Sequence, residues 1–420
     1  MKQFIISYLP FILLIATAIT SCRNLEKVAP GPEIQMVYIN DFLGKPQKSF
    51  SVDESGGSTS FLPRISNPMQ TPVDLIVSVD DEALKSYNKE NNTQFAQLPA
   101  ETYDLVLLSK SGEVLEKGKE IKLSLAAGEY GREINVQVTK MSKTVTGKDG
   151  TSEEEPLPTF QNFAIPVSIK SVAGNNVSSQ ANARSGILLI NRKFTAKAAH
   201  FSGGGAWFWY RVDKGDSDEP LPEDIPWKQW TYQVFVRFDR IGDGNIGWTW
   251  NNRRKNGEEW GYHCLYGPKG FTMFTSAGKL GFNQKGYEDF EFKPNQWYHM
   301  AMTSDEKEDG KTEVRYYIDG NLALSVNLAG HSQGWYRAFL GNSAFKGYIR
   351  DFRVWTKALT QGEINETMWA VNPESEGLEL YMPLDGNFDN KIPGKENYWI
   401  IGSKGTARFD SSFTFPEEKN

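Results

Sequence analysis

Apolar and polar residues alternate with a period of two in short runs along most of this 420-residue chain, and Gly, Pro, Asn and Asp separate the runs. Such runs predict β-strands that bury one face and are joined by turns. In the first half of the chain the predicted strands are Ile34–Ile39, Val73–Val79, Tyr103–Leu108, Ile121–Leu125, Glu133–Val138, Phe163–Ile169 and Gly186–Ile190. Short strands at this spacing predict a small β-sandwich.

A second series of strands follows an expected junction at residues 191–197. Its members are Ala198–Phe201, Trp230–Phe238, Gly261–Leu265, Gly270–Thr275, Gln296–Thr303, Glu313–Ile318, Ala338–Leu340, Gly347–Trp355, Leu378–Pro383 and Trp399–Ile401. So many strands with Gly- and Asn-marked turns predict one large two-sheet jelly roll. The predicted fold class is therefore all-β.

Two short helices interrupt the predicted strands. We expect one at Asp81–Asn88, capped by Asp80 or Asp81, and one at Thr360–Met368, where Thr360 and Glu363 have capping-box spacing. The polar, acidic segment 142–160 predicts a mobile hairpin loop, in which the triple glutamate at 153–155 is a solvated face.

The N-terminal end has the pattern of a targeting segment. A lysine at position 2 precedes the apolar stretch Phe4–Ile19, which is shorter than the roughly 20 residues that a membrane-spanning helix needs. Ile19-Thr20-Ser21-Cys22 resembles a bacterial lipobox, and the resemblance implies cleavage before Cys22 and acylation of that residue. We expect a lipoprotein signal peptide at residues 1–22 and a polar tether at 23–32; the alternative is an ordinary signal peptide with a chance cysteine. The lipid anchor would leave Cys264 without a disulfide partner in the chain.

The first half of the chain also resembles a known family. The motifs are Val77-Ser78-Val79-Asp80, Tyr87-Asn88, Leu98-Pro99 with Tyr103, and Phe163-Ala164-Ile165-Pro166-Val167. They resemble the DUF1735 type of N-terminal domain, which occurs in Bacteroidetes outer-membrane lipoproteins ahead of a glycan-binding or glycan-cleaving module. The resemblance covers residues 33–192 and implies an immunoglobulin-like sandwich with a spacer or platform role.

The second half resembles a laminin-G-like domain of the concanavalin A-like lectin/glucanase superfamily. The motifs are Gln296-Trp297-Tyr298-His299-Met300-Ala301, Arg315-Tyr316-Tyr317-Ile318-Asp319-Gly320, and Phe339-Leu340-Gly341-Asn342 followed by a run from Phe345 to Trp355. The resemblance covers residues 198–415 and implies a concanavalin A-like jelly roll. Because this fold hosts lectins, enzyme-attached modules and glycosidases, function has to be argued from the site.

The sequence carries no recognisable catalytic motif. The Glu-x-Asp-x-x-Glu arrangement of laminarinase-like glycosidases is absent, as are the metal and nucleophile motifs HExxH, GxSxG and CxxC. We therefore expect no enzyme, although a carboxylate pair drawn from separate strands stays open. His299 is expected to be a hydrogen-bonded structural histidine. Asp243 and Asn245 in a turn, with five acids in the 214–224 loop, leave Ca²⁺ as an open possibility.

Aromatic residues, at 13% of the chain, carry the binding hypothesis. Trp230, Trp297 and Trp355 lie in apolar runs and are expected in the core. Trp248 and Trp250 share one face of a strand by the period of two, and Asn256-Gly257 predicts the hairpin turn that leads to a returning strand. Sugar C–H faces pack on flat aromatic rings. The candidate ligand-binding residues are Trp248, Trp250, Trp260, Tyr262, Trp335 and Tyr336.

These observations together predict a lipid-anchored, non-catalytic carbohydrate-binding protein of the outer membrane. It would capture a polysaccharide or glycan for an uptake system, on the cell surface rather than the periplasmic face, with outer-membrane glycan transporter components as candidate partners. A formal net charge of −6 without a long basic run excludes nucleic acid as a partner. The alternatives are a glycoside hydrolase with a non-standard carboxylate pair and a protein-binding adhesin.

Overall fold

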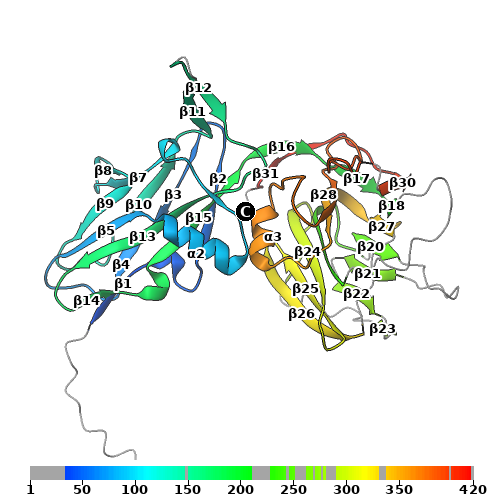
Figure 1. The fold of residues 1–420 in the computed structure, drawn as a ribbon, viewed down its shortest axis with the longest axis horizontal. Coiled ribbons are helices and arrows are strands. Elements are labelled where there is room, and N and C mark those ends of the chain that lie inside the picture. Colours follow the sequence, from blue (N-terminus) through cyan, green and yellow to red (C-terminus); the bar gives the residue numbers. More distant parts are fainter. Residues whose placement is uncertain are drawn as a thin grey trace, which may run out of the picture.

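The computed structural model describes residues 34–146, 150–210, 228–242, 246–250, 262–267, 270–275, 278–280, 290–330, 337–396 and 399–417. Its two parts lie side by side along the longest axis, the N-terminal domain in blue to green and the C-terminal domain in green to red (Figure 1). Strands make up most of both parts, and the predicted all-β class is confirmed.

The N-terminal domain is a sandwich of antiparallel and parallel strands. One sheet has the order β2 (Gln47–Val52), β15 (Ser185–Arg192), β13 (Phe163–Ala173), β5 (Val73–Val79) and β9 (Glu120–Leu125), with β6 (Ala96–Gln97) beside β13. The facing sheet has the order β3 (Gly57–Phe61), β10 (Ile134–Val138), β7 (Tyr103–Leu108) and β8 (Val114–Gly118). A small third sheet consists of β14 (Val177–Ser179), β1 (Gln35–Ile39) and β4 (Pro63–Ile65).

Alternation explains the core of this sandwich. Val73, Leu75 and Val77 of β5 point inward with alternate residues exposed or half-buried, and they pack in one cluster with Leu105 and Val136 of the facing sheet. Every strand predicted for this half is present. The helix α2 (Asp81–Asn91) extends three residues beyond its predicted end, and the Asp80 carboxylate caps it by accepting a hydrogen bond from the amide of Ala83.

The acidic segment after residue 141 was predicted as a mobile hairpin loop, but it contains two paired strands. Strands β11 (Ser142–Thr146) and β12 (Ser152–Pro156) form an antiparallel ribbon that projects from the domain (Figure 1). Its middle glutamate, Glu154, accepts hydrogen bonds from Lys140, Ser142 and Thr144. The prediction of a solvated acidic face is right, since Glu153–Glu155 are exposed, but the ribbon has regular cross-strand bonds.

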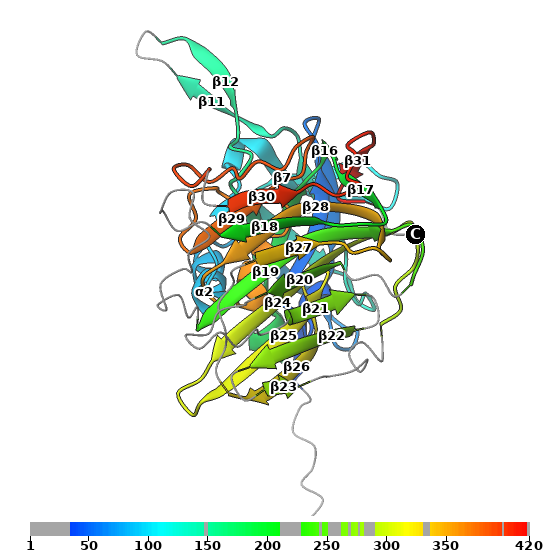
Figure 2. The ribbon, with the colours of Figure 1, turned by 90° about the vertical axis from the view of Figure 1, so that its right-hand side faces the viewer.

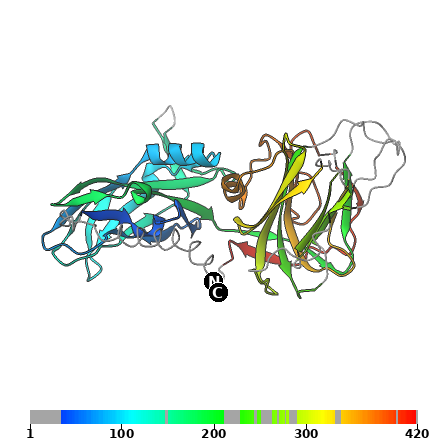
Figure 3. The same cartoon turned by 90° about the horizontal axis from the view of Figure 1, so that it is seen from below.

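In its described residues, the C-terminal domain has two seven-stranded sheets that face each other. The inner sheet, which faces the N-terminal domain, has the order β17 (Ala199–Ser202), β28 (Lys346–Trp355), β19 (Gln229–Phe238), β24 (Trp297–Glu306), β25 (Lys311–Ile318) and β26 (Asn321–Ala329), and β29 (Leu378–Met382) pairs with β28. The outer sheet has the order β23 (Gly278–Leu280), β22 (Gly270–Thr275), β21 (Tyr262–Gly267), β20 (Gly247–Trp250), β27 (Arg337–Leu340), β18 (Ala206–Tyr210) and β30 (Trp399–Ser403). Figure 3 shows both sheets nearly edge-on, with the outer sheet farthest from the N-terminal domain.

Large side chains fill both sides of the inner sheet. Trp230 packs between the two sheets, whereas Trp297 and Trp355 pack on the opposite side, towards the N-terminal domain. All three are at most 3% exposed, which confirms their predicted core positions. The short helix α3 (Gln361–Thr367) covers part of this second side, and it begins with the predicted capping box between Thr360 and Glu363.

A very short linker joins the two domains. Only Lys193 separates β15 from β16 (Phe194–Lys197), and β16 pairs with the last strand, β31 (Ser412–Phe415). Beneath this pair the guanidinium of Arg350 lies 4.9 Å from the Phe194 ring centre and 4.3 Å from that of Phe415. The aromatic faces therefore stabilise a cation that is only 4% exposed.

The predicted lipoprotein segment, residues 1–22 with Cys22, and the tether lie outside the described residues. In the part of the chain that is described, no helix has both the length and the apolar character to span a membrane.

Candidate functional site

The outer sheet places aromatic residues in rows across adjacent strands. Strand β27 lies between β18 and β20, and Phe339 is opposite both Trp207 and Trp248. Directly opposite residues of antiparallel strands lie on the same face of a sheet. Two residues further along each strand, Arg337 is opposite both Trp209 and Trp250, and Trp250 is also opposite Tyr262 of β21.

The neighbouring positions show which face these rows occupy. Phe208 and Ala338, which alternate with the row residues, are at most 1% exposed and belong to the core between the sheets. Trp207 and Phe339 are half-buried instead. The rows therefore lie on the face turned away from the core, which Figure 2 shows towards the viewer. With strands about 4.8 Å apart and residues about 3.3 Å apart, the two rows span roughly 10 by 7 Å.

The Trp207 ring packs against two neighbouring strands on this face. Its ring stacks near that of Phe339, with 6.4 Å between ring centres and 27° between planes. It also lies across Gly402 of β30, where an added Cβ would come within 2.1 Å of the indole. A side chain at position 402 would displace the ring, so this packing requires glycine there.

The structure locates three of the six predicted binding residues. Trp248, Trp250 and Tyr262 occupy strands of the outer sheet that pair antiparallel, β20 with β21, with a bulge between Thr249 and Trp250. The predicted turn at Asn256-Gly257 lies outside the described residues. Trp260, Trp335 and Tyr336 lie outside the described residues. Sequence reasoning left Trp207 and Phe339 out of the candidate set. The period-two pattern of Trp207 and Trp209 was the available signal, but their row depends on pairing with a strand about 130 residues away.

The predicted calcium loops also lie outside the described residues, at Asp243, Asn245 and 214–224. Among the described residues, no group of three or more His, Cys, Asp or Glu side chains is arranged to hold a metal ion.

His299 differs from its prediction. It is 1% exposed, as a structural histidine should be, but neither ring nitrogen has a hydrogen-bond partner among the described residues. Its ring packs against Phe235, with 4.9 Å between ring centres. Burial, together with the nearby Arg353 cation, lowers the pKa of His299 to about 3, so the imidazole stays neutral.

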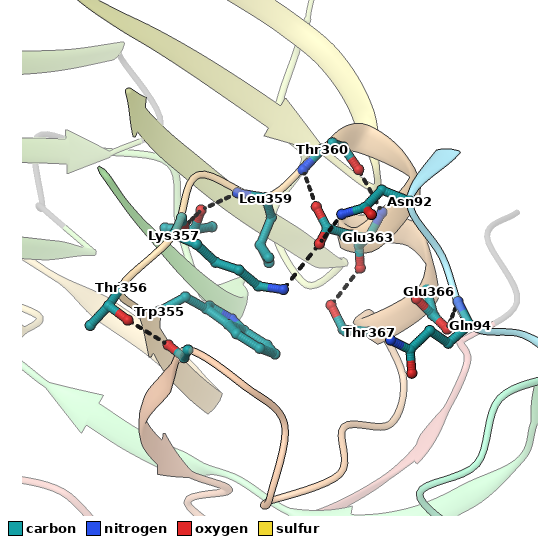
Figure 4. Close-up of polar contacts among 12 residues, drawn as sticks. Asn92, Gln94, Trp355, Thr356, Lys357, Leu359, Thr360, Glu363, Glu366 and Thr367 are labelled. Atoms are coloured by element: carbon teal, nitrogen blue, oxygen red, sulfur yellow. Dashed lines mark hydrogen bonds and ion pairs between the residues drawn. The ribbon is translucent and has the colours of Figure 1, made fainter. Parts of the chain in front are cut away.

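A set of polar contacts lies between the domains, where the end of α2 meets the start of α3 (Figures 1 and 4). The Thr360 hydroxyl donates to the carbonyl of Asn91 at 3.0 Å. Gly362 lies so close that an added Cβ would be 2.5 Å from that same carbonyl oxygen. Asn92, in a left-handed conformation with φ 55°, donates through Nδ2 to Glu363 Oε1 at 2.9 Å. We call these four residues and Glu363 the interdomain contact.

Two carboxylates of α3 take part in this region with different electrostatics. Glu363 accepts hydrogen bonds from the Thr360 amide at 2.7 Å and from Lys357 Nζ at 3.0 Å, in addition to Asn92. Glu366 accepts only the amide of Gln94, at 2.7 Å, among the bonds that the described residues show. Burial raises the pKa of Glu366 to about 7, and the neighbouring Glu363 charge adds to the shift. Figure 4 shows both carboxylates at the interface.

Family models match both domains. Residues 198–365 match the concanavalin A-like lectin/glucanases superfamily, and residues 32–176 match a family of N-terminal domains. The predicted laminin-G-like assignment is thereby confirmed, while the DUF1735 name stays a prediction. Among curated proteins, none matches the chain.

Several solved structures are similar at low identity. A candidate carbohydrate-binding protein of Bacteroides ovatus is 18% identical over 90% of this chain and 97% of its own, with a TM-score of 0.36. EndoBT-3987 of Bacteroides thetaiotamicron, solved with a Man5GlcNAc product, is 20% identical over 34% of this chain and 28% of its own, with a TM-score of 0.23. A two-domain protein of unknown function from Bacteroides fragilis is 10% identical over 78% and 92%, with a TM-score of 0.27.

Proposed function

We propose that this chain, whose C-terminal domain is a member of the concanavalin A-like lectin/glucanases superfamily, binds a polysaccharide or glycan without cleaving it. The finer parts of the proposal are a lipid anchor at Cys22, an outer-membrane location on the cell surface, and delivery of the captured glycan to an uptake system. The motifs of the N-terminal residues support the anchor, and the outer sheet supports the binding role.

One observation carries the binding role. The register of β18, β27 and β20 aligns Trp207, Phe339 and Trp248 on the face of the outer sheet that is turned away from the core. Aromatic side chains give a large contact area with little loss of conformational entropy, and their flat faces suit the C–H faces of sugar rings. Arg337, at the register position between Trp209 and Trp250, supplies a residue type that can donate hydrogen bonds to hydroxyl groups.

The N-terminal domain has the role of a spacer in this proposal. It lies on the side of the C-terminal domain opposite to the outer sheet (Figure 3). A chain held at its N-terminal end would therefore turn the aromatic rows away from the point of attachment. Individual sugar contacts are weak, and many copies on one surface raise the effective affinity through multivalency.

Native affinity electrophoresis through gels that contain single polysaccharides tests the proposal. We expect at least one polysaccharide to retard the protein, and Trp207→Ala and Trp248→Ala to weaken the retardation about tenfold, which corresponds to about 1.4 kcal/mol. Tyr130→Ala, at a tyrosine that is 51% exposed on the N-terminal domain, is the matched control and should migrate like the parent.

Two results would argue against glycan capture by this face. The first is the absence of retardation across a broad panel by a protein that circular dichroism shows to be folded. The second is retardation that both tryptophan variants leave unchanged. Release of reducing sugar from a retained polysaccharide, abolished by one Asp or Glu substitution, would instead establish a glycoside hydrolase.

A further inference from the structure

A cleft of about 770 Å³ lies between the two domains, beside the interdomain contact. The N-terminal domain contributes residues 44–47 and Ser49 around the start of β2, the end of α2 and part of β15. The C-terminal domain contributes the turn between β25 and β26, helix α3 with the residues after it, and Glu417. A volume of this size is typical of small-molecule binding sites, which span roughly 300–1,000 Å³.

The cleft is lined mainly by neutral polar side chains. Six of the lining residues carry carboxamides, and they come from both domains: Gln47, Asn91, Asn191, Asn321, Gln361 and Asn365. The charged lining residues are one lysine, Lys45, and two acids, Asp319 and Glu417. A lining with so little excess charge does not favour a phosphate or another polyanion. Carboxamides both donate and accept hydrogen bonds, as hydroxyl groups do, so they suit a neutral polyhydroxyl ligand.

Most of these carboxamides keep hydrogen-bonding capacity for a ligand. Gln361 uses one N–H to donate to the carbonyl of Gly320 at 2.9 Å, and Asn321 donates to the carbonyl of Asp319 at 3.2 Å. Each amide oxygen and second N–H is left over by these bonds. Asn191 and Asn365 make no side-chain hydrogen bond within the described part of the chain.

An aromatic surface completes the lining. Trp369 is half-buried and stacks on Phe235, with 5.0 Å between ring centres and 30° between planes. Trp297, which also lines the cleft, is 3% exposed, and its indole Nε1 has no hydrogen-bond partner among the described residues. A buried donor without a partner is costly to the folded state.

We propose that the interdomain cleft is a second binding site for a neutral saccharide of a few sugar units, separate from the outer sheet. The proposal takes its ligand class from the proposed function, but it uses other residues and another part of the molecule. Trp369 supplies the ring face, and the carboxamides of both domains hold the hydroxyl groups. Because both domains contribute walls, a bound saccharide stabilises the arrangement in which they meet at the interdomain contact.

Isothermal titration calorimetry of the full chain with neutral trisaccharides (maltotriose, cellotriose, xylotriose and mannotriose) tests this site. Ser49→Trp fills the cleft from an exposed position of β2, so it removes no packing. Ser124→Trp is the matched control at an exposed position of β9, on the opposite edge of the same sheet. Trp369→Ala removes the ring face and is the second variant. We expect at least one trisaccharide to bind, with affinity reduced at least tenfold by Ser49→Trp and by Trp369→Ala, and unchanged by Ser124→Trp.

The outcomes separate this site from the outer sheet. Trisaccharide binding that survives Trp248→Ala but not Ser49→Trp supports the cleft, even if the outer sheet binds nothing. Binding that survives Ser49→Trp overturns the cleft proposal and leaves the proposed function intact. If no trisaccharide binds while a polysaccharide still retards the protein in gels, the cleft proposal is likewise wrong.

Discussion

Asn92→Gly, a substitution in the N-terminal domain, should destabilise the C-terminal domain. Asn92 ends helix α2 in the N-terminal domain, and its side chain donates to Glu363 of α3 in the C-terminal domain at 2.9 Å. Its backbone is left-handed, with φ 55°, so alanine at this position would add strain. Glycine accepts that conformation freely and removes only the amide. The substitution therefore isolates one bond across the interface.

The expected size follows from the environment of that bond. A hydrogen bond to a charged group contributes about 1.5–3 kcal/mol when it is buried. Glu363 is 6% exposed, but Asn92 is an exposed residue, and water competes for its amide. We therefore expect a loss of about 1 kcal/mol from the free energy of unfolding of the C-terminal domain. If the free energy of unfolding falls by about 2.5 kcal/mol per molar urea, this loss lowers the urea concentration at the unfolding midpoint by about 0.4 M.

The distribution of tryptophan makes the measurement specific. All 12 tryptophans follow residue 200, so urea unfolding followed by tryptophan fluorescence reports on the C-terminal domain alone. Asn176→Gly is the matched control: Asn176 is exposed, has φ 56° and lies beside β14, on the N-terminal domain and outside the interdomain contact. A midpoint that Asn92→Gly leaves within error of the control would refute an energetic connection between the domains at this place.

Three further predictions concern single residues. Because burial raises the pKa of Glu366 from 4.5 to about 7, the folded protein binds this proton more tightly than the unfolded chain. The stabilisation that comes from protonated Glu366 is complete below pH 4.5 and is lost as the pH rises through about 7. Glu366→Gln should therefore flatten the plot of the urea midpoint against pH in this range. An unchanged slope would contradict the raised pKa of Glu366. Gly402→Val should displace the Trp207 ring and so abolish retardation of the protein in polysaccharide gels. Its melting temperature should not fall by much. Unchanged retardation would mean that the Trp207 ring contacts no ligand. His299→Leu should be neutral or stabilising by up to about 1 kcal/mol in thermal unfolding, because it removes two buried nitrogen atoms without partners; a loss above about 2 kcal/mol would show a hidden hydrogen bond.

The sequence was most informative where alternation alone decides the structure. Val73–Val79 was predicted with its exact bounds, because apolar and polar residues take opposite faces of the strand. Strands β2, β3 and β8 were not predicted, because their residues are mostly polar, half-buried or exposed, and pairing with neighbours places them. The two capped helices were found from local rules, since a cap and its helix are adjacent in the chain.

The candidate sites show where local rules end. The period of two placed Trp248 and Trp250 on one face, but only the partner strand β27, with buried Ala338 and half-buried Phe339, shows that this face is turned away from the core. The bond between Asn92 and Glu363 joins residues 271 positions apart, and nothing in either segment identifies the other. Glu363 was predicted as a capping residue, which is right, and its second role depends on the docking of two domains.

The pairing of β16 with β31 brings the entry and exit of the C-terminal domain side by side, with Phe194 opposite Phe415. A domain whose two ends meet can be transplanted into a surface loop of another protein without stretching either connection. The transferable unit is residues 194–415, because β29, β30 and β31 all follow residue 365, where the family match ends. A transplant cut at that residue would lose an edge strand from each sheet and the strand that closes the junction.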